Sequence, residues 1–526
     1  MPARREMHTG RYNFLHRSWG PLEPFDDSMP AILDANGIHA HKVTDHQHYW
    51  EDGGATYHQR FTTFDFVRGQ EGDKWIGDVE KLRDEKLAHG RWPENQWTKM
   101  ARQDLINRQV MSTSEEQPQH ITFDLGLEFI ERNVEADNWF LQIETFDPHE
   151  PFFSQDEFKE IYPHEYAGPE FDWPPYRELR EDQQSVEHIR YLYASLLAFC
   201  DQQLGRVLDA FDRYELWDDT MLLVNTDHGF LMGEHDWWAK VINPFFQEIA
   251  HIPFWAYDPR LPSEKGKRSN ALTQTIDLPA TILDYFDLSR PDNMQGRSIF
   301  GSRDDHNASR EAALFGVMGG HVNVTDGRYV YMRGNVTEDN SPLFEYTLMP
   351  ARMRGMFSPK ELTNWEESAG FSFTKECKLM KIPSRVPKMF TSKDNPVGAG
   401  RMSTMLFDTH ADPGQLTPIY DPVLESRMIR LMLREMARND SPAEQYVRLG
   451  LPEPKGDTYD PIMPSEQAIL DACTPEPSGG REEFAAGNGI PKMPFPNIPG
   501  GKETQSLSFP SNLRLSPTYP YKVDKN

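Results

Sequence analysis

Three short apolar runs separated by a long helical pattern constrain the fold of this chain more than any other feature. The runs cover residues 139–146, 220–226 and 251–257, and each has the length and apolar content of a buried strand in a parallel sheet. Between the first two, the apolar residues of 185–214 recur on one face of a helix. The order strand, helix, strand predicts a right-handed parallel crossover. We therefore expect an α/β fold with a mixed, mostly parallel sheet flanked by helices.

The sequence changes in character after about residue 310. Residues 321–334 predict two strands joined by an Asp-Gly turn, and residues 425–439 predict an amphipathic helix. Proline, glycine and serine dominate from residue 451 onward, as is typical of an extended or loose segment. The predicted organisation is a catalytic α/β domain at 1–310, a smaller C-terminal α+β subdomain at 311–450 and a Pro/Gly-rich tail at 451–526.

Composition excludes several classes of function. With 55 Lys and Arg against 82 Asp and Glu, the net charge is −27, which disfavours nucleic acid and anionic lipid as partners but allows a local cationic site for an anion. No run of about 18 apolar residues is present, so no membrane span is predicted. Cys200, Cys377 and Cys473 are too far apart in sequence to indicate a disulfide framework or a zinc site. Both a cytoplasmic and an exported location stay open.

The stretch from Asn225 to Lys240 carries the strongest chemical signal. Asp227 and His228 directly follow a predicted strand, and at the carboxyl end of such a strand both side chains can point into one site and bind a metal. Gly229 allows the chain to turn sharply after them. A structural turn capped by the aspartate is the alternative, but the Gly-Glu-His stretch and Lys240 downstream favour a functional site.

His149 marks a second candidate loop, at the end of the run 139–146. Pro148 and Pro151 restrict the loop around it. A histidine held at the carboxyl end of a strand can bind an oxyanion or protonate a leaving group. A histidine in a surface turn is an equally good interpretation of this stretch alone.

A third candidate loop follows a strand predicted near residues 38–43. His46 and His48 are side chains of a type that binds metals, as is Asp45. Packing of the two histidines against Tyr49 and Trp50 is the more common alternative.

Taken together, these stretches resemble the sulfatases of the alkaline phosphatase superfamily, over residues 1 to about 320. A weaker similarity to the family's C-terminal segment is found at residues 406–422. Sulfatases carry a Cys (or Ser)-x-Pro-x-Arg motif followed by Thr-Gly-Arg, and the first residues of this chain match it in spacing at Pro2, Arg4, Thr9, Gly10 and Arg11. The resemblance places the nucleophile, a formylglycine made from that Cys or Ser, immediately before Met1. We therefore expect the chain as given to lack the nucleophile and the family's first strand, and to be inactive.

The resemblance also implies roles for individual residues. Asp227 and His228 would be metal ligands, and Arg4 would hold the nucleophile and the metal site. Calcium is the metal that the family implies, although imidazole suits manganese or zinc better than calcium. The family's pair of metal-binding aspartates belongs to the strand before the nucleophile.

Four further residues are assigned to substrate by the same resemblance. Lys240 and His149 would bind sulfate oxygens and assist departure of the leaving group, His48 would be the base that acts on the formylglycine hydrate, and His46 would contact substrate. The family has a lysine where this chain has Asp45, which affects the alignment of His46 and His48.

The function that follows is hydrolysis of a sulfate monoester, carried by a small molecule or a saccharide, through a metal-assisted formylglycine mechanism. Two alternatives remain open from the sequence. One is a phosphonate monoester or phosphodiester hydrolase of the same superfamily. The other is a non-catalytic protein that binds an anion without a nucleophile.

Overall fold

A parallel sheet of three strands carries the N-terminal half of the fold, with strand order β2-β1-β3. β1 (His39–Thr44) pairs in parallel with β2 (Thr63–Phe66) on one side and β3 (Trp139–Glu144) on the other. The carboxyl ends of the three strands therefore meet at one edge of the sheet. The computed structural model describes residues 1–84, 98–301, 310–337, 339–385, 402–456 and 460–474.

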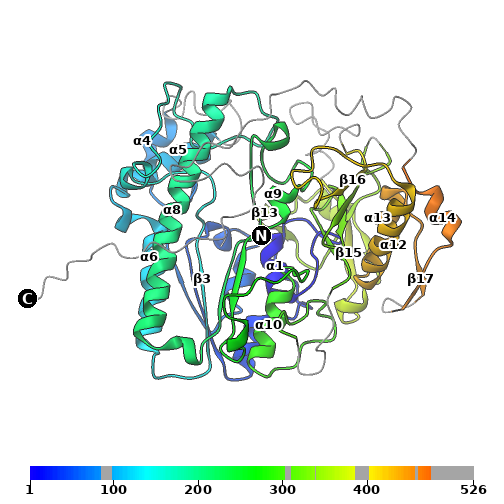
Figure 1. Ribbon diagram of the computed structural model, residues 1–526, viewed down its shortest axis with the longest axis horizontal. Coiled ribbons are helices and arrows are strands. Elements are labelled where there is room, and N and C mark those ends of the chain that lie inside the picture. The colour runs from blue at the N-terminus through cyan, green and yellow to red at the C-terminus, as the bar shows by residue number, and fades with distance from the viewer. Residues whose placement is uncertain (85–97, 302–309, 338, 386–401, 457–459, 475–526) are drawn as a thin grey trace, which may run out of the picture.

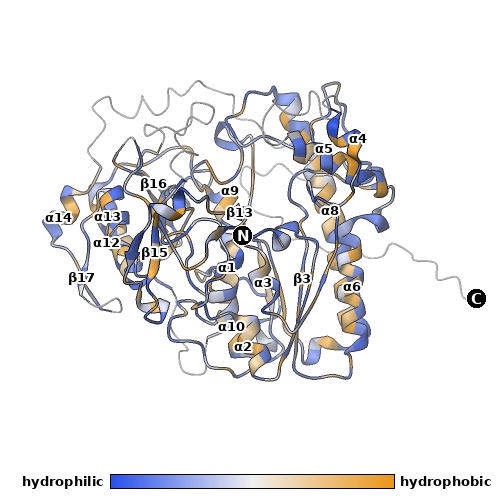
Figure 2. Ribbon diagram, turned by 180° about the vertical axis from the view of Figure 1, so that it is seen from behind, coloured by the Kyte–Doolittle hydropathy of each residue, from blue (hydrophilic) through white to orange (hydrophobic). Residues whose placement is uncertain are grey.

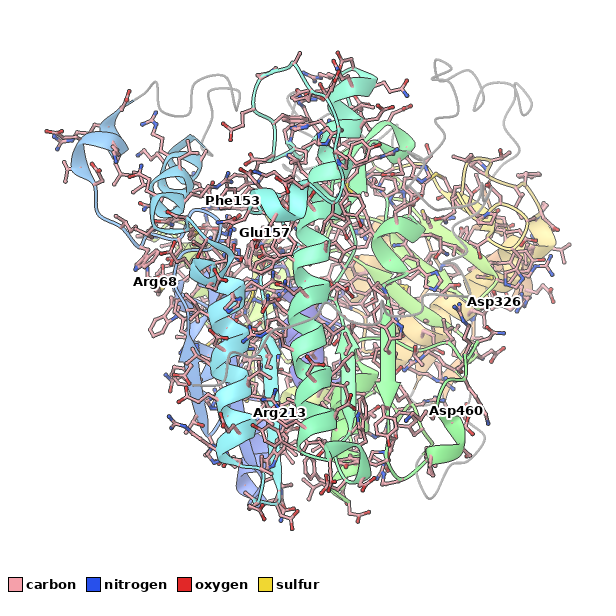
Figure 3. All side chains as sticks on the ribbon, turned by 60° about the vertical axis from the view of Figure 1, so that its left-hand side comes forward. Arg68, Phe153, Glu157, Arg213, Asp326 and Asp460 are labelled. Carbon is pink, nitrogen blue, oxygen red and sulfur yellow. The ribbon has the colours of Figure 1, made fainter. Side chains whose placement is uncertain are left out.

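Two amphipathic helices cover this sheet. α8 (Gln183–Arg213) confirms the long helix predicted at 185–214, and the side chain of Asp182 caps its first turn by accepting from the Ser185 amide. α6 (Pro118–Arg132) packs beside α8, on the left of Figure 1. Figure 2 shows apolar and polar residues alternating along both helices, and Figure 3 shows α8 running the height of the molecule with Arg213 near its lower end. Their apolar stripes pack against Leu141 and Ile143 of β3, which stay half-buried.

The predicted parallel crossover from β3 into the next strand is wrong in its pairing. β4 (Leu222–Asn225) hydrogen-bonds antiparallel to β7 (Phe254–Tyr257) and not to β3, so the run at 251–257 is a strand but not a parallel one. The connection between β4 and β7 includes the four-residue α9 (Gln247–Ala250) and no long helix. The three runs are strands as predicted, but they are not buried as predicted: β3 and β4 are at most half-buried, and Trp255 of β7 is 60% exposed.

Antiparallel sheets form the C-terminal part, on the right of Figure 1. One sheet has the order β16-β10-β9-β8, and it includes the hairpin predicted at 321–334 as β9 (Val322–Thr325) and β10 (Tyr329–Arg333). The helix predicted at 425–439 is α12 (Pro422–Arg438), whose apolar face packs on this sheet. The other strands of the C-terminal part are β8 (Ala313–Gly316), β16 (Met405–Asp408), β11 (Phe344–Thr347), β14 (Glu366–Ser368) and β15 (Leu379–Pro383).

Short elements complete the described chain. The helices are α1 (Pro2–Thr9), α2 (Met29–Ala35), α3 (Ala55–His58), α4 (Val79–Arg83), α5 (Thr98–Asn107), α7 (Asp156–Lys159), α10 (Asp277–Tyr285), α13 (Ala443–Leu449) and α14 (Glu466–Asp471). The two-stranded ladders pair β5 (Leu231–Met232) with β6 (Trp238–Ala239), β12 (Ala351–Arg352) with β13 (Gly355–Met356), and β17 (Lys455–Gly456) with β18 (Pro461–Ile462). No helix within the described ranges has the length and apolar content that a membrane crossing requires.

The start of the predicted tail differs from expectation. α14 packs against α12, and Ile469 is fully buried in the largest apolar cluster, so the residues just beyond 451 include a packed element. The Pro/Gly-rich remainder of that predicted tail, residues 475–526, lies outside the described residues.

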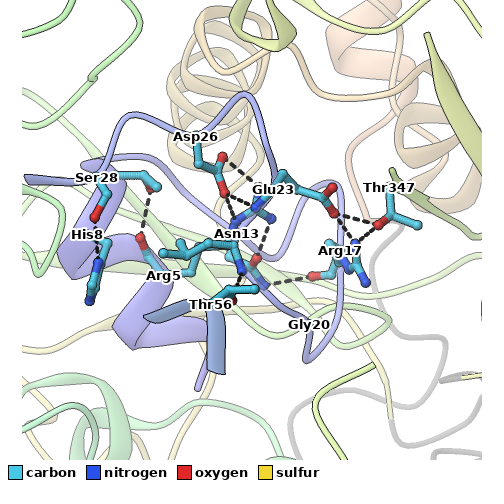
Figure 4. Close-up of polar contacts among 12 residues, drawn as sticks. Arg5, His8, Asn13, Arg17, Gly20, Glu23, Asp26, Ser28, Thr56 and Thr347 are labelled. Carbon is cyan, nitrogen blue, oxygen red and sulfur yellow. Dashed lines mark hydrogen bonds and ion pairs between the residues drawn. The ribbon is translucent and has the colours of Figure 1, made fainter. Parts of the chain in front are cut away.

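A buried ion pair joins the N-terminal segment to the C-terminal sheets (Figure 4). Arg17 and Glu23 both have fully buried side chains and are paired with each other and with Thr347 of β11. Arg17 Nη2 also donates to the carbonyl oxygen of Ala351, 2.6 Å away, at the start of the β12–β13 hairpin. Because an unpaired buried charge is costly, this network fixes the hairpin against the N-terminal half.

The tip of the β12–β13 hairpin docks directly on the N-terminal half. The Met353 amide donates to the carbonyl of Trp19 at 3.2 Å, and the Gly53 amide donates to the carbonyl of Met353 at 2.9 Å. The Met353 side chain is fully buried with Met1, Leu22 and two tyrosines. A Cβ on Gly53 would lie 2.5 Å from the Arg352 carbonyl oxygen, so the approach of the two backbones requires glycine there.

We predict that Gly53→Ala lowers the free energy of unfolding by about 1–3 kcal/mol, because the hairpin must move to admit the methyl group. Urea unfolding measures this. The matched control is Gly355→Ala in the same hairpin, where a Cβ meets nothing within 4 Å; its change should stay within about 0.5 kcal/mol. Equal stabilities of the two variants would contradict the docking.

Candidate active site

Arg4 reaches from α1 to two carboxylates on different strands. Its Nε donates to Glu144 Oε1 at 2.8 Å, at the end of β3, and its Nη1 donates to Asp227 Oδ2, just after β4. Pro2 stands in the first turn of α1, and Gly10 ends the helix in the left-handed region with φ +63°. A Cβ on Gly10 would also lie 2.3 Å from Met294 Cγ, so both conformation and space require glycine in this Thr-Gly-Arg segment.

Glu144 is the most heavily contacted carboxylate of the site. Besides Arg4, it accepts from Lys42 Nζ at 2.6 Å and from the Tyr49 hydroxyl at 2.9 Å. Burial alone would raise the pKa of Glu144, but the charges of Lys42 and Arg4 outweigh it and lower that pKa to about 2. The sequence analysis did not predict the pair of Lys42 and Glu144. A lysine inside a buried strand nevertheless indicates that a partner exists, because a buried charge needs one.

Asp227 and His228 lie side by side, with His228 Nε2 3.3 Å from Asp227 Oδ2. His228 Nδ1 is 3.0 Å from the Gly229 carbonyl, to which it can only donate, so Nε2 carries no proton in the neutral ring. Burial lowers the pKa of His228 to about 4, which keeps the ring neutral near pH 7. The Asp227 carboxylate oxygen and the unprotonated His228 Nε2 therefore face each other. Both atoms are electron-pair donors, and a metal cation stabilises such an arrangement.

The number of donors is smaller than a metal site needs. Calcium takes about 6–8 oxygen ligands. Among the residues that the structure describes, no group of three or more His, Cys, Asp and Glu side chains could hold a metal ion. Asp227 and His228 thus fit as two ligands, and they do not complete a site by themselves.

Lys240 and His149 share one buried carboxylate, Glu150. Lys240 Nζ lies 3.2 Å from Glu150 Oε2, and His149 Nδ1 lies 3.2 Å from the same oxygen. The Tyr176 hydroxyl donates to Glu150 Oε1 at 2.5 Å. Burial and then Lys240 lower the pKa of His149 well below its ordinary value, so its ring is neutral near pH 7. Lys240 is therefore a buried cation with a partner, not a solvated side chain.

The backbone around Lys240 is strained. Ala239 and Val241, its two neighbours, have φ values of +70° and +80°. A β-branched residue such as valine adopts this region at a clear cost, and such outliers gather at functional sites. The strain supports a functional role for the lysine that these residues hold.

The rings of His46 and His48 both pack on Phe146, which also contacts His149. Burial and then the charge of Arg354 lower the pKa of His48 well below its ordinary value. Asp45, the departure from the family pattern, accepts from the Phe146 amide at 2.6 Å and so holds the loop after β3. The predicted residues of this loop therefore border the others, at a site rim that also includes Arg354.

All seven predicted residues are thus brought to one cluster around the ends of β1, β3 and β4. The backbone amino group of Met1 belongs to it as well: burial, followed by the charge of Arg4, lowers its pKa to about 4, and the charges of Asp227, Glu144 and Lys240 act on the same group. Glu144, Lys42, Glu150 and Arg354 are the members that sequence reasoning did not find.

We predict that Glu144→Gln costs about 3–5 kcal/mol of stability, because it leaves the buried charges of Lys42 and Arg4 without their partner. Since the pKa of Glu144 falls from 4.5 to about 2 on folding, this stabilisation is present above pH 4.5 and is lost as pH falls toward 2. Chemical unfolding over this pH range measures both effects. Glu128→Gln, which breaks an exposed pair with Arg132, is the control and should change stability by less than about 1 kcal/mol. A Glu144 variant as stable as this control would refute the assignment.

Comparison with known proteins identifies the family to which the chain belongs. A profile of the sulfatase family matches residues 1–288. An arylsulfatase of Clostridium perfringens is 27% identical over 203 residues, which cover 35% of this chain and 41% of that protein, so the match spans less than half of that relative. An ulvan-active sulfatase of Formosa agariphila is 25% identical over 415 residues, covering 75% of this chain and 73% of that protein.

A solved structure shows the same fold. It holds a protein in complex with its substrate, D-glucosamine-2-N,6-O-disulfate, and it matches with a TM-score of 0.51 and 12% identity over 84% of this chain and 88% of that one. This likeness supports the α/β fold with its parallel sheet, helices and C-terminal antiparallel sheets. Because the family profile covers more than half of the residues, the chain belongs to the sulfatase family of the alkaline phosphatase superfamily.

Proposed function

We propose that this sulfatase-family chain carries the machinery of a sulfuric ester hydrolase that uses a formylglycine at the position immediately before Met1. One observation carries the proposal. α1, the helix that follows this position, places Arg4 in contact with Asp227. The amino group of Met1 is buried near the charges of Arg4, Asp227 and Lys240. A residue joined to Met1 would therefore enter the same cluster. A formylglycine hydrate there supplies the covalent nucleophile for attack on sulfur.

The residues of the chain then have separable tasks. Arg4 is held by two carboxylates and orients the nucleophile without moving. Lys240 binds an oxygen of the sulfuryl group, where charge grows as the ester bond breaks. His149 is neutral, with its protonated Nδ1 donating to the Glu150 carbonyl, so Nε2 carries a lone pair. Nε2 therefore first takes up a proton from water and then passes that proton to the oxygen of the leaving alcohol. His46 contacts substrate. His48 is the base toward the hydrate, and for this role Arg354 must release the Nε2 lone pair that it contacts at 2.7 Å.

The sulfatase family typically uses a divalent metal, and we propose Asp227 and His228 as two of its ligands. The unprotonated His228 Nε2 opposite a carboxylate oxygen supports this assignment. A mixed nitrogen and oxygen pair favours manganese or zinc over calcium, which prefers oxygen.

The substrate we propose is a sulfated saccharide or a small sulfate ester. The support comes from the relatives, which include an ulvan-active sulfatase and an arylsulfatase. The chain's net charge of −27 makes local cations such as Lys240 necessary for any anionic substrate.

The direct test compares residues 1–526 with the same chain extended before Met1 by the family's first strand, with its pair of metal-binding aspartates, and by a cysteine that directly precedes Met1 and is converted to formylglycine. The extended protein should hydrolyse 4-nitrophenyl sulfate at least about a thousandfold faster than the unextended one, because the covalent nucleophile is restored. A phosphonate monoester is assayed in parallel. Faster turnover of the phosphonate would favour a phosphonate hydrolase, and equal inactivity of both proteins would favour an anion-binding protein.

A second test separates the catalytic role of Lys240 from its structural one. Lys240→Met alone leaves Glu150 buried and unpaired, so we expect a loss of about 3–5 kcal/mol. Combining it with Glu150→Gln removes both charges and should recover most of that stability. In the formylglycine-bearing chain, the double variant should still lose about a hundredfold or more in turnover, because the sulfuryl oxygens lose their cation. Near-normal turnover in a well-folded double variant would reject the role of Lys240.

A further inference from the structure

A polar cavity of about 190 Å³ lies where three segments of the chain meet. One segment is the C-terminal half of α12, the second leads into β8, and the third follows α10 (Figure 1). The cavity is several times larger than the roughly 30 Å³ that one water molecule occupies in the liquid. It shares no lining residue with the candidate active site. We call it the arginine cavity, because its charged lining residues are Arg297, Arg310, Glu311, Arg434, Glu435 and Arg438.

The lining of the arginine cavity carries more positive than negative charge. Four arginines against two glutamates give +2, in a protein whose net charge is −27. Glu435 is buried, and its Oε1 accepts both from Arg434 Nε at 3.3 Å and from Arg438 Nη1 at 3.2 Å. Both distances exceed the roughly 2.7–2.9 Å of a strong ion-paired hydrogen bond. Arg434 Nη1 also pairs with the exposed Glu311 at 2.8 Å. One shared oxygen leaves several guanidinium hydrogens of this helix face without an acceptor.

Two further arginines keep donors that no described residue accepts. The Arg310 side chain is only 9% exposed, and its Nη2 pairs with Asp277 of α10. Its Nε is buried and has no acceptor in the part of the chain that the structure describes. Arg297 donates its backbone amide to the same Asp277 at 2.8 Å, but its exposed guanidinium makes no hydrogen bond or ion pair within the described ranges. An unsatisfied buried donor costs free energy, and a bound anion would remove that cost.

We propose that the arginine cavity binds a free tetrahedral oxyanion with about two negative charges, of the class of inorganic sulfate and phosphate. Guanidinium groups donate to such anions through two parallel N–H groups. The four arginines come from three segments and therefore donate from different directions. The oxygens of a tetrahedral anion also point in different directions, whereas the two oxygens of a carboxylate lie in one plane. This site does not depend on the proposed function.

The position of the cavity gives the bound anion a structural effect. The anion would bridge α12 to the chain that follows residues 1–288, the part that the family profile matches. Because the three segments come together only in the folded protein, the anion binds the native state and stabilises it.

Isothermal titration of residues 1–526 at constant ionic strength tests the site with sodium sulfate, sodium phosphate and sodium acetate. We expect saturable binding of sulfate and of phosphate. Acetate has one charge and a planar carboxylate, so it should bind about tenfold or more weakly than sulfate, as expected for the loss of one charged hydrogen bond.

Arg297→Gln combined with Arg438→Gln locates the binding. Glu435 keeps Arg434 as its partner in this variant, so no buried charge is left alone. The affinity for sulfate and phosphate should fall about tenfold or more. Arg297→Gln alone removes an exposed guanidinium without a partner in the described ranges, so it tests the site without disturbing the fold, and it should lower the affinity about threefold or more.

Two control variants separate the cavity from other sources of binding. Arg132→Gln combined with Arg213→Gln removes the same total charge from exposed positions on α6 and α8, and should change the affinities by less than about twofold. Lys240→Met combined with Glu150→Gln alters the candidate active site and should leave the saturable binding in place.

Several results would overturn the assignment. Absence of binding by both sulfate and phosphate would do so, as would acetate binding as tightly as sulfate. An equal loss of affinity in the control with Arg132 and Arg213 replaced would show that only the overall charge matters. Loss of all binding with Lys240 and Glu150 replaced, and not with Arg297 and Arg438 replaced, would assign the anion to the candidate active site instead.

Discussion

The Glu144 carboxylate is the interaction on which the arrangement of the site depends. It accepts from Arg4 on α1, from Lys42 on β1 and from Tyr49 in the following turn, and it stands at the end of β3. Lys42 is fully buried, and its charge is tolerable only because this carboxylate is 2.6 Å away. One acidic side chain therefore fixes the N-terminal helix against the edge of the sheet, and through Arg4 it also fixes the position of Asp227.

A consequence is that the site consists of paired charges and not of a simple cationic patch. Arg4 lies between Glu144 and Asp227, and Lys240 lies beside Glu150. Each pair costs desolvation energy and gains Coulomb energy in return. An arriving anion competes with these carboxylates for the cations. In a chain with a net charge of −27, such fixed cations are the means by which an anion can be held at all.

The two halves of the chain meet around this cluster. The buried Arg17–Glu23 pair and the docked β12–β13 hairpin carry residues from beyond position 345 to the edge of the N-terminal sheet (Figure 4). The N-terminal half carries the residues that match the sulfatase family, and the C-terminal half contributes Arg354, which donates to His48.

The sequence by itself determined the elements with a strong local period and the residues of contiguous motifs. The helix at 183–213, the hairpin around Asp326-Gly327 and the helix at 422–438 follow from repeating apolar positions and turn chemistry, and Arg4, Asp227 and Lys240 follow from motif spacing. Only the tertiary structure decided that β4 pairs antiparallel with β7, that Glu144 is the partner of Lys42 and that Arg354 reaches His48. The physical reason is that a local apolar pattern predicts which kind of element forms. The burial of a strand, its direction and the partner of a buried charge depend on contacts between residues far apart in the chain, which no local pattern encodes.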